Sequence, residues 1–353
     1  MADQYFDQAL AINHNYASAL MWKGIGAERR GRLPEALKHY QHAAVLEPVS
    51  VVVVVNLAWA LQASGALDKA MDLLQRVDAQ GRTSAHYQRV ISSLLLDRGD
   101  FVNAYRNAVR AMESSEGDRL SVEQMALILQ LLGETDEAWG LVRSLYRNGN
   151  FDSVGTSVVE EILLSSNTEL RSNAAQAIDG LFRQEHQLPE IVWRRHTALL
   201  GLIDAYAGNC VSAAKRLGSA VQLGTGSIHG TDFDLLFCNT LTLSLRESGA
   251  SQRSREQRIV CENEIESALS QGWNSHWITY AEAQMALLDG RPEEGIRKLK
   301  SLEERGFLRP DMFQNDPSFI PIRQHSEYRH LMQRIRHLLN DARIEIISMK
   351  GEG

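Results

Sequence analysis

The most distinctive hydrophobic pattern in this sequence is an apolar run from Val49 to Leu61, which includes five consecutive valines. A helix that crosses a bilayer needs about 20 apolar residues, so the run is too short for a membrane span. Valine favours strands, and the local composition therefore leaves both a buried strand and a helix open. The periodicity of the rest of the chain has to decide between them.

A short phrase that begins with glycine and ends with alanine recurs four times at a constant spacing in the first half of the chain. Its copies are Gly31–Ala36, Gly65–Ala70, Gly99–Ala104 and Gly133–Ala138. A fixed period of this size, about 34 residues, indicates repeated pairs of helices. In each pair the glycine ends the first helix in a left-handed cap, and the alanine lets the second helix approach closely. The valine run is therefore predicted to be the first helix of the second pair.

This pattern resembles the tetratricopeptide repeat, whose small and large apolar residues recur at fixed positions with a period of about 34 residues. Four units match in phase, over residues 17–50, 51–84, 85–118 and 119–152. The matching positions are Leu20, Lys23, Gly24, Ala27, Ala36, Tyr40 and Pro48, then Val54, Leu57, Ala58, Leu61, Ala70 and Leu74, then Gln88, Ile91, Ser92, Leu95, Ala104 and Ala108, and finally Val122, Met125, Ala126, Leu129, Ala138 and Val142. The resemblance implies an all-α, right-handed solenoid of helix hairpins, regular to about residue 152.

Outside these four units the regular period is lost. Residues 1–16 are interpreted as a half repeat or a capping helix, and we favour a half repeat that belongs to a longer protein. Residues 153–340 are predicted to hold irregular helical repeats, because Gly208–Ala213 and Gly290–Gly295 restore the phrase out of phase with the earlier copies. Residues 341–353 are predicted to be a tail.

The sequences GRPEEGIRKLKSLEERGF and NDPSFIPIRQHSEYRHLMQRI lie in the last third of the chain. They resemble the closing segment of helical-repeat domains in bacterial winged-helix transcriptional activators of the CadC/ToxR type and in class III adenylate cyclases. The resemblance covers roughly residues 275–340 and implies a sensing or regulatory domain. No winged-helix or cyclase sequence precedes Tyr5, so we expect neither activity from this chain.

The net charge and the cysteine content limit which kinds of partner and which cellular compartment we expect. The net charge is −7, so direct binding of nucleic acid, which needs a basic surface, is not expected. Cys210, Cys238 and Cys261 are an odd and widely spaced set, and we expect free thiols in a reducing compartment. The N-terminal sequence MADQYFDQALAINHN lacks the pattern of a signal peptide. These features favour the cytoplasm, with the periplasm as the alternative if the chain belongs to a membrane-anchored regulator.

No motif for catalysis or for metal binding is evident. The phrase Gly224–Gly230 lacks the lysine and the preceding strand of a phosphate loop, and His39 and His42 have no carboxylate to complete a metal site. Acidic pairs such as Glu160 and Glu161 are adjacent on helices and diverge. We therefore expect no enzymatic activity, no cofactor and no metal. The alternative is an enzyme with an unrecognised site in the irregular half, around residues 224–256.

The remaining functional signal lies in the valine run. One face of its helix is predicted to pack inside the array, but Val52, Val55 and Trp59 form a second apolar stripe. By resemblance, this stripe lines the concave groove in which such repeats bind a peptide or protein. The groove candidates are Met21, Ile25, Val52, Val55, Asn56, Trp59, His86, Arg89 and Ser93, with Asn56 and Arg89 setting the orientation of the partner. The alternative is that the stripe simply packs against the next helix.

Overall fold

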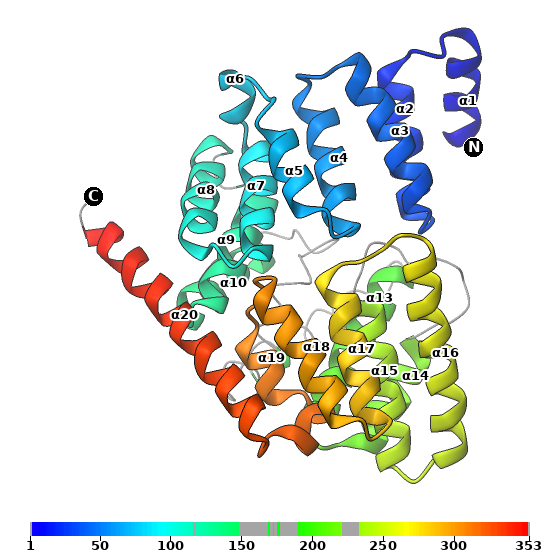
Figure 1. Ribbon diagram of the computed structural model, residues 1–353, viewed down its shortest axis with the longest axis vertical. Helices are drawn as coiled ribbons and strands as arrows, with labels where there is room; N and C mark the ends of the chain where they lie inside the picture. Colours follow the sequence, from blue (N-terminus) through cyan, green and yellow to red (C-terminus); the bar gives the residue numbers. More distant parts are fainter. Residues whose placement is uncertain are drawn as a thin grey trace.

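The computed structural model describes residues 2–115, 118–147, 190–220 and 233–351, with four single positions between 169 and 176. Its elements are helices, and no strand occurs among the described residues (Figure 1). The first half contains α1 (Ala2–Ile12), α2 (Ala17–Arg29), α3 (Leu33–Leu46), α4 (Val51–Ala63), α5 (Leu67–Leu74), α6 (Ala79–Arg82), α7 (Ala85–Asp97), α8 (Phe101–Ser114), α9 (Arg119–Leu131) and α10 (Thr135–Arg147). The second half contains α13 (Glu190–Tyr206), α14 (Cys210–Ala220), α15 (Phe233–Glu247), α16 (Ser251–Ser270), α17 (His276–Leu288), α18 (Pro292–Glu304), α19 (Pro310–Asn315), η2 (Pro317–Ile322) and α20 (Ser326–Gly351). The predicted all-α solenoid of helix hairpins is confirmed.

The valine run is helical, as the period of the glycine phrase predicts. Val53, Val54 and Val55 are at most 2% exposed, because α4 packs between α3 and its own hairpin partner α5. Full burial of a valine side chain contributes about 1.5 kcal/mol or more. At each buried valine this contribution exceeds the strand preference, which spans about 1 kcal/mol per residue.

The repeated glycines and alanines have the roles that the sequence indicates. The four glycines of the repeated phrase have positive φ angles between 74° and 82°, and the four alanines are fully buried. The first unit shows why small residues recur at the helix contact. A Cβ on Gly24 would lie 2.4 Å from Cε1 of Tyr40, so only glycine leaves room for this tyrosine ring.

The second half departs from the period of the first half, as predicted, but it has a spacing of its own. Gly208, Gly249 and Gly290 have positive φ angles and are evenly spaced along the chain, at the turns of the hairpins α13–α14, α15–α16 and α17–α18. The residue five positions after each glycine is small: Ala213, Ser254 and Gly295. The phrase is hard to recognise at the middle turn because serine stands there in place of alanine. The long gap between Gly208 and Gly290 is therefore two equal units.

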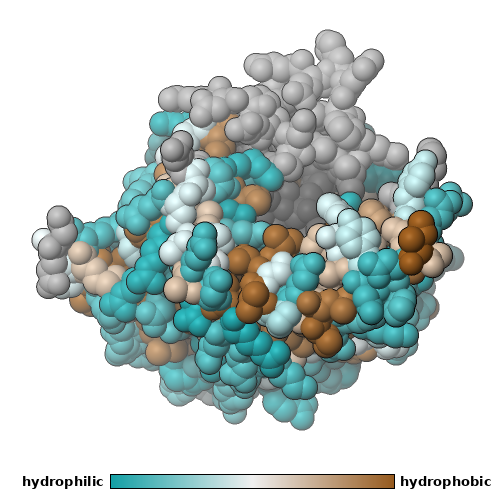
Figure 2. Space-filling view, turned by 90° about the horizontal axis from the view of Figure 1, so that it is seen from above, coloured by the Kyte–Doolittle hydropathy of each residue, from teal (hydrophilic) through white to brown (hydrophobic). Residues whose placement is uncertain are grey.

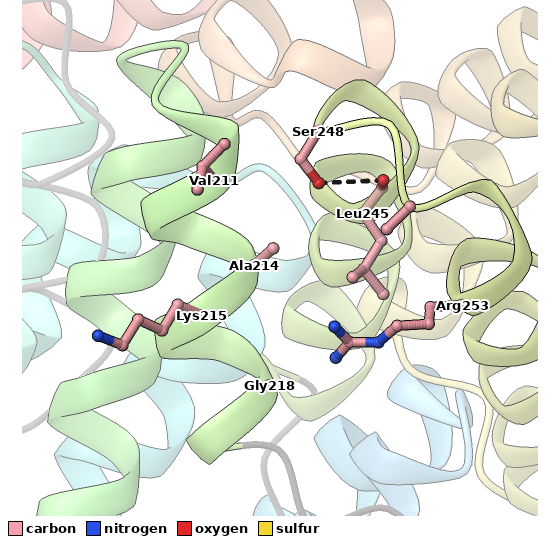
Figure 3. A pocket seen from close by; sticks show the side chains of 8 residues that line it. Val211, Ala214, Lys215, Gly218, Leu245, Ser248 and Arg253 are labelled. Atoms are coloured by element: carbon pink, nitrogen blue, oxygen red, sulfur yellow. Dashed lines mark hydrogen bonds between the residues drawn. The ribbon is translucent and has the colours of Figure 1, made fainter.

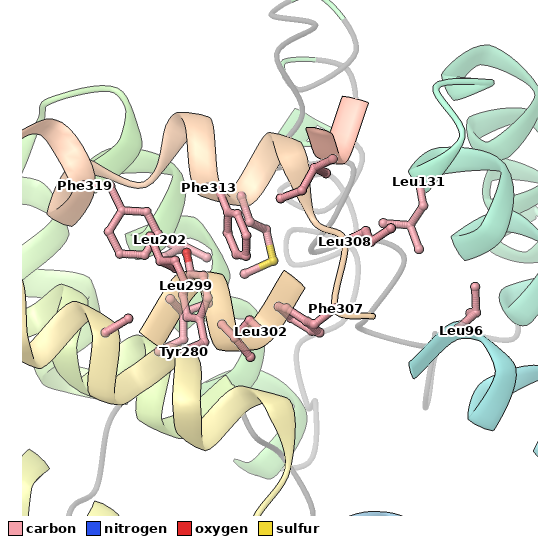
Figure 4. Close-up of a cluster of buried hydrophobic side chains, with 14 of the residues drawn as sticks. Leu96, Leu131, Leu202, Tyr280, Leu299, Leu302, Phe307, Leu308, Phe313 and Phe319 are labelled. Carbon is pink, nitrogen blue, oxygen red and sulfur yellow. The ribbon is translucent and has the colours of Figure 1, made fainter. Parts of the chain in front are cut away.

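The two halves meet along the glycine turns of the first half, which we call the docked rim (Gly31, Gly65 and Gly99). Trp273 Nε1 donates a hydrogen bond to the Gly31 carbonyl oxygen at 2.8 Å, and the Asn274 amide donates to the Ala63 carbonyl oxygen at 2.9 Å. Figure 4 shows Leu308 between the side chains of the second half and Leu96 and Leu131 of the first. The docked rim is thus flanked by two hydrophobic clusters, each of which contains residues of both halves.

The last helix returns to the first half of the chain (Figure 1). α20 continues to Gly351, so residues 341–351 are helical and the predicted tail is wrong over this range. Arg343 Nε lies 2.7 Å from Glu134 Oε1, and Ile346 is 3% exposed. Long-range packing against α8 and α10 holds this segment in helical conformation, which the local pattern did not reveal. Residues 352 and 353 lie outside the described residues.

The cysteines also differ from the prediction. Cys238 of α15 and Cys261 of α16 form a disulfide, and Cys210 is free. Both bonded cysteines are buried. They lie almost equally far before and after Gly249 in the sequence, so folding at this turn brings them together across the hairpin. The sequence separation of the two cysteines does not by itself predict the disulfide, because the position of the turn between them has to be known first.

The carboxylate of Asp97 lies at the junction between the halves. Gln62 Nε2 donates a hydrogen bond to Asp97 Oδ2 at 2.6 Å, and His276 Nδ1 lies 3.7 Å from Oδ1. Burial alone would raise the pKa of Asp97, but the His276 imidazole, the Gln62 amide and the Arg309 charge lower this pKa below its usual value. The ionised carboxylate therefore stabilises the folded chain.

We expect Asp97→Asn to lower the free energy of unfolding by about 1 kcal/mol at neutral pH. Because the folded pKa is depressed, the stabilisation is present above the unfolded-state pKa of about 3.9 and is lost as pH falls through the folded value. Denaturant unfolding of both proteins across the acid range should show the difference narrowing below pH ~4. A difference that stays constant with pH would rule out a role for the charge.

Candidate functional site

The first turns of α2, α4, α7 and α9 form the rim opposite the docked rim, which we call the free rim. Figure 2 looks down on this side and shows several apolar side chains in a mostly hydrophilic surface. The predicted groove residues lie on these helices, between the two rims. The docked rim closes one end of this surface against the second half of the chain.

The predicted stripe on α4 divides into exposed and buried members. Val52 is 45% exposed and Trp59 is 47% exposed, whereas Val55 is 0% exposed and packs in the same core as Val54. Val55 is therefore unavailable to a partner, because the helix rotates its side chain toward neighbouring helices, and we remove it from the proposed surface. The other candidates are half-buried: Met21, Ile25, Asn56, His86, Arg89 and Ser93.

The polar candidates are already engaged within the chain. Asn56 Nδ2 donates to the Val52 carbonyl oxygen at 2.7 Å, and Arg89 Nη1 lies 3.2 Å from Asp118 Oδ2. Gln62 Nε2 donates to Ser93 Oγ at 3.3 Å. Burial and the neighbouring Arg89 charge lower the pKa of His86. The surface of α4 therefore offers mainly apolar contact, and the predicted orienting groups would have to exchange their present hydrogen bonds.

Sequence reasoning missed a second exposed tryptophan beside this surface. Trp22 is 46% exposed on α2, which packs against α4, and its ring stacks on Phe6 of α1 with 6.2 Å between the centroids. Its proximity to Met21 in the sequence was the available signal. Trp22 thus adds an exposed ring toward the N-terminal end of the array, against α1.

A separate cavity lies in the second half, between α14 and the turn that joins α15 to α16 (Figure 3). Its volume is about 420 Å³, and Leu245, Ser248 and Arg253 are among its lining residues. Some of its lining residues fall within residues 224–256, where the alternative of an enzyme placed its site. Residues 224–232 of that range, including Gly224–Gly230, lie outside the described residues. Ser248 Oγ donates to the Leu245 carbonyl oxygen at 3.1 Å, and the described lining contains no histidine or carboxylate to act as a base.

The part of the chain that the structure describes contains neither a metal-binding cluster nor a membrane-spanning helix. No three His, Cys, Asp or Glu side chains there are grouped so as to hold a metal ion. None of the helices there is long and apolar enough to cross a membrane. Glu160 and Glu161 lie outside this part.

Comparisons with known proteins agree with the observed repeats. Residues 27–94 match the tetratricopeptide repeat family, and no curated protein matches the chain in sequence. A Rap protein complexed with Competence and Sporulation Factor is similar in structure, with a TM-score of 0.57 and 11% identity over 92% of this chain and 98% of that chain. A human IFIT1 dimer with PPP-AAAA gives a TM-score of 0.54 and 15% identity over 85% of this chain and 67% of that chain. This chain spans 66% of the length of an IFIT1 monomeric mutant, and at such identities the likeness shows the fold alone.

Proposed function

Because this chain is a tetratricopeptide-repeat protein, we propose that it is an interaction module that binds a protein or peptide on the surface of α4. The observation that carries the proposal is Trp59, which is 47% exposed in the middle of a helix whose other large apolar side chains are mostly buried. Tryptophan is enriched among the residues that dominate binding energy at protein interfaces. The net charge of −7 favours a protein partner over a nucleic acid.

The shape of the surface suggests how a partner would bind. Val52 and Trp59 lie two turns apart on α4, and Trp22 on α2 extends the apolar area sideways. A helix that presents apolar side chains at three- and four-residue spacing, or an extended segment, can span this distance. Asn56, between the two exposed residues, is the nearest group that could hydrogen-bond to the partner.

The wider role that we propose is sensing or regulation in bacterial transcription control or signalling. It is supported by the resemblance of residues 275–340 to regulator repeat domains. The structural similarity to a Rap protein complexed with Competence and Sporulation Factor is compatible with this role. The enzyme alternative predicts turnover that depends on the cavity at Ser248, and a purified chain with such an activity would contradict the proposal.

We expect Trp59→Ala to weaken partner binding about 30-fold, which corresponds to ~2 kcal/mol, while leaving the unfolding temperature nearly unchanged. Val54→Ala should behave in the opposite way, because Val54 is fully buried and its truncation leaves a cavity that costs about 1–3 kcal/mol of stability. The measurements are thermal unfolding of both variants and titration with a partner isolated by affinity enrichment.

Trp193→Ala is the matched control, since Trp193 is 41% exposed on α13 in the other half of the chain. It should change neither binding nor stability appreciably. If Trp59→Ala unfolds the chain as readily as Val54→Ala, Trp59 supports the core and the proposal loses its main evidence. Unchanged binding in the Trp59 variant would place the partner elsewhere, and equal losses in the Trp59 and Trp193 variants would show that the effect is not specific to α4.

A further inference from the structure

We propose that the second half carries a separate binding groove for an acidic peptide segment, located at the cavity between α14 and the α15–α16 turn. This inference does not depend on the proposed surface of α4, because the two regions lie on different repeats. The groove is defined by Val211, Ala214, Lys215 and Gly218 on one side and by Leu245 and Arg253 on the other.

Small side chains create the groove. Val211, Ala214, Lys215 and Gly218 fall at three- and four-residue steps and form one face of α14. Glycine and alanine on this face leave a volume of about 420 Å³, within the range of about 300–1,000 Å³ that is usual for binding pockets. Leu245 is buried at the base, and Val211 at the edge is 73% exposed. The groove can therefore accept short aliphatic side chains.

Two cationic side chains, Lys215 and Arg253, line the groove, and its described lining contains no carboxylate. Arg253 and Lys215 have no ion-pair partner among the described residues, whereas nearby Arg216 and Arg258 pair with Asp204 and with Asp289. Figure 3 shows Arg253 extending across the cavity toward α14, while the Lys215 ammonium turns outward. A guanidinium that extends across an apolar cleft can bind a carboxylate in a two-pronged hydrogen bond.

A peptide fits these features better than a nucleic acid or a small metabolite. The lining contains no aromatic ring on which a base could stack, and two cations are few for a phosphate backbone. The Ser248 hydroxyl is occupied by the Leu245 carbonyl, so few polar groups remain to orient a small molecule. A peptide needs only a carboxylate for Arg253 and small side chains for the floor, because its backbone holds these groups in place.

The test is a selection of random dodecapeptides displayed on phage against the immobilised full chain. The most enriched peptides are then synthesised with a fluorescent label and titrated by anisotropy. We expect them to carry Asp or Glu beside Ala, Val or Ser, and Arg253→Glu to weaken their binding at least tenfold. The control is Arg255→Glu, which makes the same charge change on the exposed side of α16, outside the groove. It should alter binding less than twofold.

Circular dichroism of both variants checks that the fold is intact. The inference is overturned if no peptide is enriched, if the enriched peptides lack carboxylates, or if Arg253→Glu and Arg255→Glu weaken binding equally. Loss of these peptides in Trp59→Ala but not in Arg253→Glu would also overturn it, while supporting the surface of α4. If only Arg253→Glu loses binding of the enriched peptides, the peptides bind in the groove. The proposal for the surface of α4 is then tested separately, by the Trp59→Ala variant.

Discussion

Replacing Gly306 with alanine is expected to lower the free energy of unfolding by about 2–4 kcal/mol, because two penalties coincide at this residue. Its φ angle is +91°, a region that residues with a Cβ rarely adopt. A Cβ there would also lie 2.2 Å from the carbonyl carbon of Arg98 and 2.4 Å from the amide nitrogen of Gly99. Both neighbours are backbone atoms of the docked rim, so they cannot move aside as a flexible side chain can.

Gly290→Ala isolates the first penalty. Gly290 follows α17 as Gly306 follows α18, and its φ angle is +73°, but a Cβ there would meet no atom within 4 Å. We expect this control to lose only about 1 kcal/mol. Denaturant unfolding of the two variants measures the difference. Equal losses would show that the two halves are not packed closely at Gly306 and would contradict the docked rim.

The second large effect concerns the disulfide. Cys238→Ser is expected to lower the free energy of unfolding by about 2–4 kcal/mol, because the bond joins cysteines with a sequence separation of 23 and restricts the unfolded chain. Adding a reductant to the wild-type chain should produce a similar loss, and reductant should have little further effect on the variant. Chemical denaturation with and without reductant tests both expectations.

Cys210→Ser is the matched control, since Cys210 is free and half-buried, and it should change stability by less than about 0.5 kcal/mol. Intact mass after alkylation of the denatured but unreduced chain counts the free thiols directly. One alkylated cysteine supports the bond, whereas three contradict it. Because structural disulfides persist mainly in oxidising compartments, the bond leads us to propose the periplasmic alternative over the cytoplasm.

At the candidate sites, the sequence did not predict which side chains are exposed or where a cavity forms. Periodicity placed Val52, Val55 and Trp59 on one stripe of α4, but the structure buries Val55 and exposes the other two. A helical stripe covers a broad angle, and the neighbouring helices decide which part of it stays open. The cavity at Arg253 left no sequence signal, because it forms between helices of two units. Its position depends on how those units stack.

The sequence by itself determined the helices of the first half and their order. The repeated phrase requires a glycine at each left-handed turn and a small residue at each close approach, and both requirements act within one hairpin. The tertiary structure alone decided the docked rim, the disulfide and the course of α20. Cys238 meets Cys261 within one hairpin, whose turn has to be located before the pair can be recognised. Gly31 meets Trp273 and Glu134 meets Arg343 across separations that no local period records. These two contacts arise because the solenoid curves back on itself, and that curvature is the sum of packing between successive units.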